Sequence, residues 1–234
     1  MSEINGFDVN VIATGSTGNC TILDSFLALD MGVPFIAVRR YMRNLRLVFI
    51  SHEHGDHLNP STVRMLSRFR PMLRFCAGPF LVDRLIAAGV DRRNIDVIED
   101  GNIYAYGPIT LEAVKLRHNV DCFGLKVYTK QGRKCLYAVD TGTMEGITAK
   151  GFDLYLLEAN HRQAELEERA REKMEAGLYP YELAAAQNHL SYEQAMDWLA
   201  ENMGPNSLWL PMHGHVKRGG EDSGGKANVY PENH

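Results

Sequence analysis

The stretch that decides the fold is Ser51-His52-Glu53-His54-Gly55-Asp56-His57. It follows a nearly continuous apolar run, Leu45 to Ser51, which has the length and character of a strand buried on both faces. In an extended chain the first two histidines point to the same side, and the glycine allows a bend that turns the aspartate and the third histidine toward a neighbouring position. Imidazole and carboxylate groups together suit zinc, manganese or iron. One short segment could therefore serve two metal ions.

On either side of this motif, groups of short strands alternate with helices. The pattern predicts strands within 7–30, 45–51, 103–158 and 207–212, and helices that begin at Asn59 or Ser61, near Pro79, at Arg162 and at Ser191. This order indicates an α/β fold with two mixed β-sheets and outer helices in one domain. We expect the domain to span residues 1–216, and the Gly-rich, charged stretch 217–234 to form a flexible tail.

The composition is that of an ordinary globular protein. The chain has 234 residues, of which 45% are hydrophobic and 23% charged, enough for one core without disulfides. It has no apolar run approaching a membrane span and no secretory signal, and its four cysteines form no CxxC pair. We therefore expect reduced thiols, a cytoplasmic location and no membrane association.

The net charge of −4 excludes a generally basic nucleic-acid coat but leaves room for a local basic surface. Arginines flank the histidine motif at Arg39, Arg40, Arg43, Arg46, Arg64, Arg68, Arg70 and Arg74. If their helix faces line the cleft over the motif, they would track a phosphate backbone. The alternative is an ordinary solvated helix surface. Three aromatic residues among these arginines could stack on bases or pack into the core: Tyr41, Phe69 and Phe75.

An HxHxDH motif after an apolar strand resembles the signature of the metallo-β-lactamase fold, an αββα sandwich whose members are binuclear metallohydrolases. The resemblance covers about Phe7 to His215. It implies a first metal ion held by His52, His54 and His118, and a second held by Asp56, His57 and His213. It also implies that Asp140, at the end of the strand LYAVD, bridges the two ions. For the last ligand the motif favours His213 over His215, which lies two residues further on.

Other segments resemble the YycJ/WalJ-type branch, which is related to ribonuclease Z: GSTGNC at 15–20, LEANH at 157–161 and NHLS at 188–191. In that branch a histidine beside the scissile phosphate is not a metal ligand, and a glutamate at the end of the preceding strand orients it. His189 and Glu158 match these positions, so the resemblance implies catalytic roles for Asp56, His189 and Glu158. A leaving alkoxide needs a proton, and a carboxylate fixes the imidazole tautomer and raises its pKa.

The resemblance implies a binuclear phosphodiesterase that uses a metal-bridging hydroxide and two divalent ions, Zn or Mn. Nucleic acid is the favoured substrate, DNA before RNA, with exonuclease-like cleavage. One alternative is a cyclic-nucleotide phosphodiesterase of the same fold, similar to the phage anti-Pycsar enzymes. Another is an inactive metal-binding interaction protein. Several relatives are dimers, so a homodimer stays open.

Overall fold

The apolar run before the histidine motif forms β5 (Leu47–Ile50), whose four side chains are all buried. They alternate between two separate hydrophobic clusters, because successive side chains of a strand point to opposite faces of the sheet. Strand β5 is therefore an inner strand covered on both sides, as the sequence predicted. The computed structural model describes residues 2–214, so the predicted tail and the predicted domain end at 216 lie outside the described residues.

β5 belongs to a seven-stranded sheet with the order β1-β2-β3-β4-β5-β6-β7. Its first four strands pair antiparallel, and from β4 onward the strands pair in parallel, so the sheet is mixed. The other strands are β1 (Ser2–Ile4), β2 (Phe7–Ala13), β3 (Cys20–Leu23), β4 (Leu27–Leu29), β6 (Arg74–Ala77) and β7 (Ile95–Val97).

The other sheet has six strands in the order β13-β12-β11-β10-β9-β8. It is also mixed: β8 to β11 pair antiparallel, and β11, β12 and β13 pair in parallel. Its strands are β8 (Ile103–Tyr106), β9 (Ile109–Leu116), β10 (Cys122–Thr129), β11 (Lys134–Ala138), β12 (Leu154–Glu158) and β13 (Leu208–Met212). Two mixed sheets confirm the architecture that the sequence predicted.

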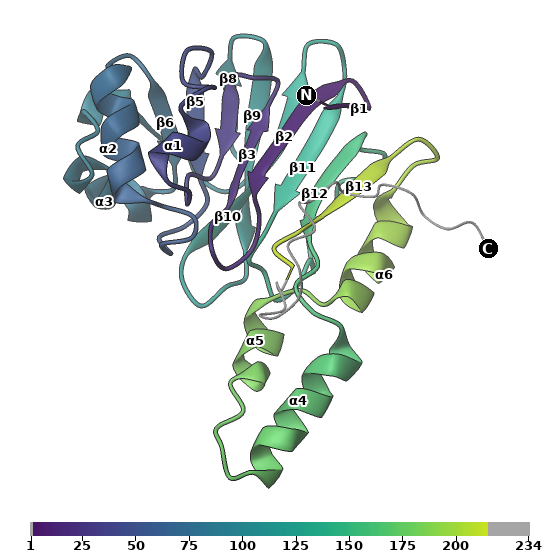
Figure 1. The fold of residues 1–234 in the computed structure, drawn as a ribbon. Coiled ribbons are helices and arrows are strands. Elements are labelled where there is room, and N and C mark those ends of the chain that lie inside the picture. Colours follow the sequence, from purple (N-terminus) through teal and green to yellow (C-terminus); the bar gives the residue numbers. More distant parts are fainter. Residues whose placement is uncertain (1, 215–234) are drawn as a thin grey trace.

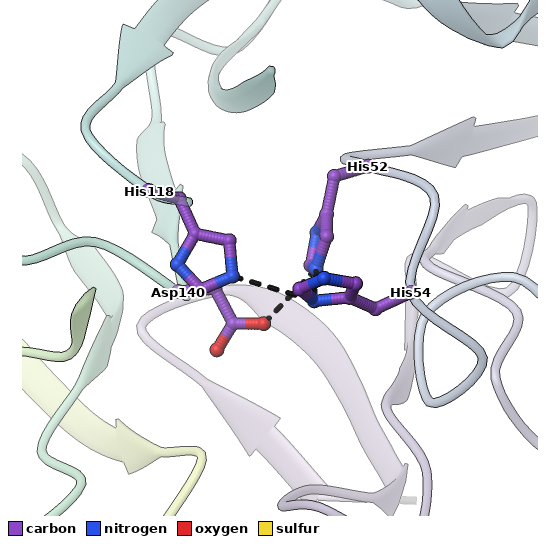
Figure 2. Close-up of side chains that lie close together, drawn as sticks. All are labelled: His52, His54, His118 and Asp140. Atoms are coloured by element: carbon purple, nitrogen blue, oxygen red, sulfur yellow. Dashed lines mark hydrogen bonds and ion pairs between the residues drawn. The ribbon is translucent and has the colours of Figure 1, made fainter. Parts of the chain in front are cut away.

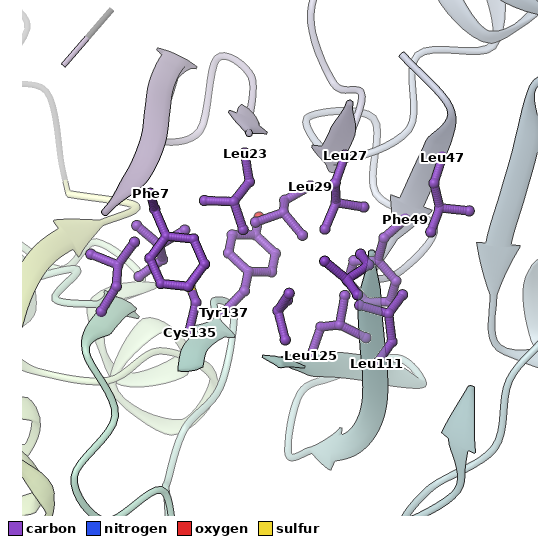
Figure 3. Packing of buried hydrophobic residues seen from close by; sticks show 14 of the residues in the cluster. Phe7, Leu23, Leu27, Leu29, Leu47, Phe49, Leu111, Leu125, Cys135 and Tyr137 are labelled. Atoms are coloured by element: carbon purple, nitrogen blue, oxygen red, sulfur yellow. The ribbon is translucent and has the colours of Figure 1, made fainter. Parts of the chain in front are cut away.

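The main core lies between the two sheets. Figure 3 shows side chains of the first sheet, such as Phe7, Leu27 and Phe49, packing against Leu125 and Tyr137 of the second. A second cluster lies between the first sheet and its outer helices, α1 (Phe35–Val38), α2 (Pro60–Phe69) and α3 (Val82–Ala87). A third lies between the second sheet and α6 (Tyr192–Asn202). These three apolar layers define an αββα sandwich.

The helix starts follow local sequence signals. Of the two caps that the sequence allowed for α2, Asn59 is the one used, since its side chain accepts hydrogen bonds from the backbone N–H groups of Ser61 and Thr62, both at 3.1 Å. Helix α6 begins with the predicted capping box, in which Ser191 and Gln194 each bond the other's backbone.

A helical hairpin projects from the sandwich and is formed by α4 (Gln163–Glu175) and α5 (Glu182–Asn188) (Figure 1). The sequence predicted α4, whereas α5 and the projection were not foreseen. The Lys173 ammonium lies 2.6 Å from the Glu182 carboxylate and 3.1 Å from the centroid of the Tyr181 ring, which joins the two arms of the hairpin. The hairpin is inserted between β12 and α6, so both of its ends return to the same edge of the second sheet.

Within residues 2–214, none of the helices combines the length and the apolar character that a membrane span requires. The four cysteines are all buried and unpaired, as expected for reduced thiols. Burial raises the pKa of each of these thiols, which keeps them protonated.

Candidate metal centre

Most of the predicted site residues lie at or after the ends of strands, at one edge of the sandwich. The histidine motif follows β5, four more residues end or follow strands of the second sheet, and His189 lies between α5 and α6. Because the carboxyl ends of parallel strands meet at one edge, residues far apart in sequence converge there. The residues of the second sheet are His118 after β9, Asp140 after β11, Glu158 at the end of β12 and His213 after β13.

The first group of possible metal ligands comprises His52, His54, His118 and Asp140 (Figure 2). The Nδ1 atom of His54 lies 3.0 Å from His52 Nε2 and 3.4 Å from His118 Nε2. His52 Nε2 also lies 3.2 Å from Asp140 Oδ2. One potential ligand atom from each residue thus lies within 4.8 Å of those of the others, a spacing that a single ion can bridge.

The second group comprises Asp56, His57, Asp140 and His213. His57 Nε2 lies 2.9 Å from Asp140 Oδ2 and 3.6 Å from Asp56 Oδ2. His213 Nε2 lies 3.2 Å from the other oxygen of Asp140, Oδ1. The structure therefore brings His213 into the cluster, while the alternative ligand His215 lies outside the described residues.

Asp140 belongs to both groups and lies between them. It is 1% exposed, and its backbone adopts a φ of 55°, a left-handed conformation that aspartate tolerates better than most residues. Burial raises its pKa, but the neighbouring imidazoles of His189, His52 and His57 outweigh burial and hold the pKa well below its usual range. Although two imidazole nitrogens lie nearby, its Oδ1 accepts no hydrogen bond within the described residues. A buried, charged oxygen without a hydrogen bond is what a bridging metal ligand requires.

Three imidazoles of the cluster, those of His54, His118 and His213, are held in the neutral form that binds metal. Burial lowers the pKa of His118 to about 4 and that of His213 to about 3, and it also lowers the pKa of His54. Neutral imidazole is the ligand form, so these rings need lose no proton before an ion binds. His118 Nδ1 donates to the backbone carbonyl of Asn188 at 3.1 Å, which turns Nε2 toward the other ligands.

Glu158 and His189 form a separate pair beside Asp140. Glu158 is fully buried, and its Oε1 lies 2.7 Å from His189 Nδ1. Its Oε2 accepts hydrogen bonds from the backbone of Thr141 at 2.9 Å and of Leu190 at 3.3 Å. Burial lowers the pKa of His189, but the neighbouring carboxylates of Asp140 and Glu158 raise it to about 10. The pair therefore holds a proton on the imidazole, with Nδ1 directed at Glu158.

Sequence reasoning missed a buried carboxylate behind the motif. Asp30 follows β4 and is fully buried, and its Oδ2 lies 2.6 Å from His57 Nδ1. The same oxygen accepts hydrogen bonds from the hydroxyls of Ser51 at 2.9 Å and Tyr137 at 2.6 Å. Asp30 thus orients His57 with its Nε2 toward Asp140. The signal that could have revealed it is an aspartate at the carboxyl end of an apolar strand next to β5.

Asn19 is the second residue that the sequence did not reveal. It is fully buried, and its Nδ2 lies 2.8 Å from His57 Nε2 and 3.3 Å from Asp56 Oδ2. Its Oδ1 accepts from the Gly15 backbone at 2.9 Å and lies 3.3 Å from His213 Nδ1. A single side chain therefore contacts three residues of the second ligand group and the 15–18 turn.

Two glycines allow close backbone approaches around the site. A Cβ at Gly32 would lie 1.7 Å from the carbonyl oxygen of Asp56, so only glycine lets β4 and the motif come together. A Cβ at Gly142 would lie 2.0 Å from the carbonyl oxygen of Gln187, near the end of α5. Gly142 therefore lets the segment that carries His189 pack beside the one that carries Asp140.

A cavity of about 290 Å³ opens over the cluster. Its described lining consists of polar and ionisable residues, without a Phe, Tyr, Trp or aliphatic side chain: Ser16, His54, Asp56, His118, Asn119, Asp140, Asn188, His189 and His213. Pockets for small organic ligands are mostly apolar and often aromatic. This lining suits a charged, hydrophilic group such as a phosphodiester better than a nucleobase.

The fold and the cluster together define a metal-dependent hydrolase of the αββα class. The comparison with family models agrees, because the Beta-lactamase superfamily domain matches residues 22–213. The chain belongs to this superfamily and is a metal-dependent hydrolase.

Curated relatives and solved structures agree with this family. The chain is 26% identical over 239 residues to the exodeoxyribonuclease WalJ of Streptococcus pneumoniae, covering 93% of this chain and 84% of the relative. The metallo-β-lactamase fold protein YhfI of Bacillus subtilis superposes with a TM-score of 0.66 at 16% identity, covering 89% and 86% of the two chains. The short form of human tRNase Z superposes with a TM-score of 0.63 at 16% identity, covering 88% and 92%. The two superpositions establish the shared fold.

Proposed function

We propose that this chain is a binuclear metal-dependent phosphodiesterase that acts as a nuclease on DNA, in the manner of an exonuclease. The observation that carries the proposal is the position of Asp140, which lies in both ligand groups and 3.3 Å from the proton-bearing nitrogen of His189. Metal ligands and a candidate proton donor therefore meet at one point. The similarity to a protein named as an exodeoxyribonuclease supports DNA as the substrate.

The residues fit two divalent ions. His52, His54 and His118 would hold one, Asp56, His57 and His213 the other, and Asp140 both. These donors are nitrogen and oxygen atoms without a thiolate, a set that zinc and manganese both accept. The ions, when bound, would supply Lewis acidity that generates a nucleophile from water at neutral pH and neutralises phosphate charge.

The chain's own groups would handle the proton of the leaving group. Glu158 keeps His189 Nδ1 engaged at 2.7 Å, which leaves Nε2 as the nitrogen available to the cavity that His189 lines. His189 would donate its Nε2 proton to the leaving oxygen as the phosphodiester bond breaks. Glu158 acts as a positioning residue, because its buried carboxylate stabilises the imidazolium and fixes the ring.

The lining of the cavity favours a polymer over a cyclic mononucleotide. A mononucleotide-specific site needs contacts to the base, and the described lining offers no Phe, Tyr or Trp side chain to stack on it. A polymer can be recognised through its phosphates alone, so the polar lining is sufficient for a nuclease.

The test is a substrate panel with the metal-loaded protein: labelled duplex DNA, single-stranded DNA, RNA, cyclic mononucleotides and bis(p-nitrophenyl) phosphate. We expect turnover of DNA with release of mononucleotides from an end. Turnover confined to cyclic nucleotides would replace the nuclease proposal by the cyclic-nucleotide alternative. An absence of hydrolysis of every substrate, with two ions bound, would indicate an inactive metal-binding protein.

A further inference from the structure

The region around the histidine motif carries a concentrated positive charge. From Met31 to Val82 the chain has eight arginines, and its only acidic residues are Glu53 and Asp56 in the motif. The chain as a whole has a net charge of −4, so this region is positively charged within a protein that is acidic overall. It contains α1 and α2, which lie together beside the first sheet, on the opposite side of the molecule from α6 (Figure 1).

Six of these arginines are exposed and lack a carboxylate partner within residues 2–214: Arg39, Arg40, Arg43, Arg46, Arg64 and Arg68. The guanidinium of Arg40 contacts only the neighbouring Tyr41. Other arginines of the same chain do find partners, as Arg74 does with Asp96 and Arg84 with Glu53. Several unneutralised guanidinium groups on one surface repel one another, and a polyanion would relieve that repulsion.

Contacts between α1 and α2 hold together the segments that carry most of these arginines. The Phe35 and Phe69 rings stack with their centroids 5.8 Å apart. The Arg70 guanidinium donates to the backbone carbonyl of Arg43 at 2.7 Å and also to that of Met42. The loop after α1 is thereby fixed against the end of α2. We call this surface the α1–α2 arginine surface, made of the six exposed arginines named above.

Helix α2 connects the α1–α2 arginine surface to the metal centre through the chain. Helix α2 begins at Pro60, three residues after His57. With a rise of 1.5 Å per residue, Arg64 and Arg68 lie about 6 Å and 12 Å along the axis from the start of α2. The hairpin helix α4 has the opposite charge balance, since it carries five glutamates against three basic residues. A polyanion leaving the metal centre would therefore be drawn toward α1 and α2.

We propose that the α1–α2 arginine surface binds the phosphate backbone of the nucleic-acid substrate beyond the scissile bond. The proposal rests on the proposed nuclease function and assigns the part of the chain that gives it affinity for a polymer. Arginine suits this role because its planar guanidinium pairs with phosphate through two hydrogen bonds and stays charged at all physiological pH values.

The experiment compares Arg64→Gln/Arg68→Gln with the control Lys150→Gln/Arg171→Gln. Both variants lose two exposed positive charges, and the control positions lie away from this surface. The metal-loaded full-length proteins are titrated with a fluorescent phosphorothioate oligodeoxythymidine, which resists hydrolysis, over a range of salt concentrations. Binding is followed by fluorescence anisotropy, and hydrolysis of bis(p-nitrophenyl) phosphate is measured in parallel.

We expect the salt slope, d log K/d log [salt], to fall in magnitude by about 1.4 in the Arg64→Gln/Arg68→Gln variant and to stay unchanged in the control. Over a fourfold rise in salt, the unaltered protein should then lose about sevenfold more affinity than this variant. Both variants should hydrolyse bis(p-nitrophenyl) phosphate as the unaltered protein does, because the small ester reaches only the metal centre.

Equal slopes in the two variants would overturn the surface proposal. So would tighter binding of poly-L-glutamate than of the oligonucleotide, since that would make the surface a docking site for an acidic protein. If the unaltered protein binds the oligonucleotide with the expected slope but cleaves only the small ester, the nuclease function fails and the binding surface stands. If it cleaves DNA and the slopes are equal, the reverse holds.

Discussion

The two sheets contribute to the metal centre in different ways. The first sheet supplies four candidate ligands from one loop after β5, all within six residues of sequence. The second sheet supplies single residues that are scattered over the chain, among them His118, Asp140 and His213. The ligands of the first sheet can be seen as a motif in the sequence, whereas those of the second sheet come together only when the strands pair in the fold.

The supports of the two halves differ as well. Behind the loop of the first sheet lie two fully buried side chains, Asp30 and Asn19, which share His57 as a partner. The residues of the second sheet depend on backbone partners, such as the Asn188 carbonyl for His118. A substitution behind the first sheet should therefore disturb several ligands through the shared hydrogen bonds. A substitution on the second-sheet side should disturb only its own ligand, except at Asp140, which belongs to both ligand groups.

The largest effect is expected at this junction. Asp140→Ala removes the carboxylate shared by both groups, so both ions should be lost and activity should fall by more than about 100-fold. Elemental analysis of the purified protein measures the metal, and the exposed Asp197→Ala on α6 is the control. Retention of two ions by Asp140→Ala would refute the bridging role.

A large but purely catalytic effect is expected on the second-sheet side. His189→Ala should keep both ions and lower kcat by about 10²- to 10⁴-fold, because the proton donor is lost. Glu158→Gln should lower kcat less and leave the metal content unchanged, since the imidazole stays in place. A loss of metal from His189→Ala would instead make His189 a ligand, in the third possible group with Asp140, Glu158 and His213.

The network behind the first sheet should give an intermediate effect. Asp30→Asn keeps the shape but weakens the hold on His57, so affinity for the second ion should fall by about 10- to 100-fold. Tyr137→Phe removes one of the hydrogen bonds to Asp30 and should act in the same direction but more weakly. Competition with a chelator measures the affinity, and unchanged binding in Asp30→Asn would show that the two halves are supported alike.

The smallest effect is expected from the backbone contact on the second-sheet side. Gly142→Ala places a methyl group against the Gln187 carbonyl, so the segment carrying His189 must shift. We expect a loss of about 1–3 kcal/mol in the free energy of unfolding, with kcat reduced and metal content retained. Gly204→Ala, whose Cβ has its nearest contact at 3.6 Å, is the control in thermal unfolding. Equal stability of the two variants would mean that the chain relaxes around the contact.

The sequence predicted two mixed sheets, the caps and the local half of the site, because each depends on neighbours along the chain. It missed three strands of the first sheet, β1, β6 and β7. His118, Asp140 and His213 were assigned through the family resemblance, and the structure brings all three into the ligand groups. Asp30 and Asn19 were missed because their partners are separated from them in sequence and meet only in the fold.

The hairpin helix α5 was missed for a different reason. It is seven residues long, and such a short helix is unstable alone in water. It forms here with the support of α4 and the Lys173–Glu182 ion pair, neither of which its own sequence encodes. Tertiary contacts, and not local helix propensity, therefore determine that this segment is helical.

The way the hairpin is attached sets unequal limits on its evolution. Its tip lies far along α4 and α5 from the metal centre, so insertions there would leave the chemistry untouched. At the base, α5 ends at Asn188, one residue before His189. One residue added at that end would displace the imidazole of His189, whose Nδ1 lies 2.7 Å from Glu158. Changes in the length of the hairpin should therefore be tolerated at its tip, between α4 and α5, and poorly tolerated at its base, next to His189.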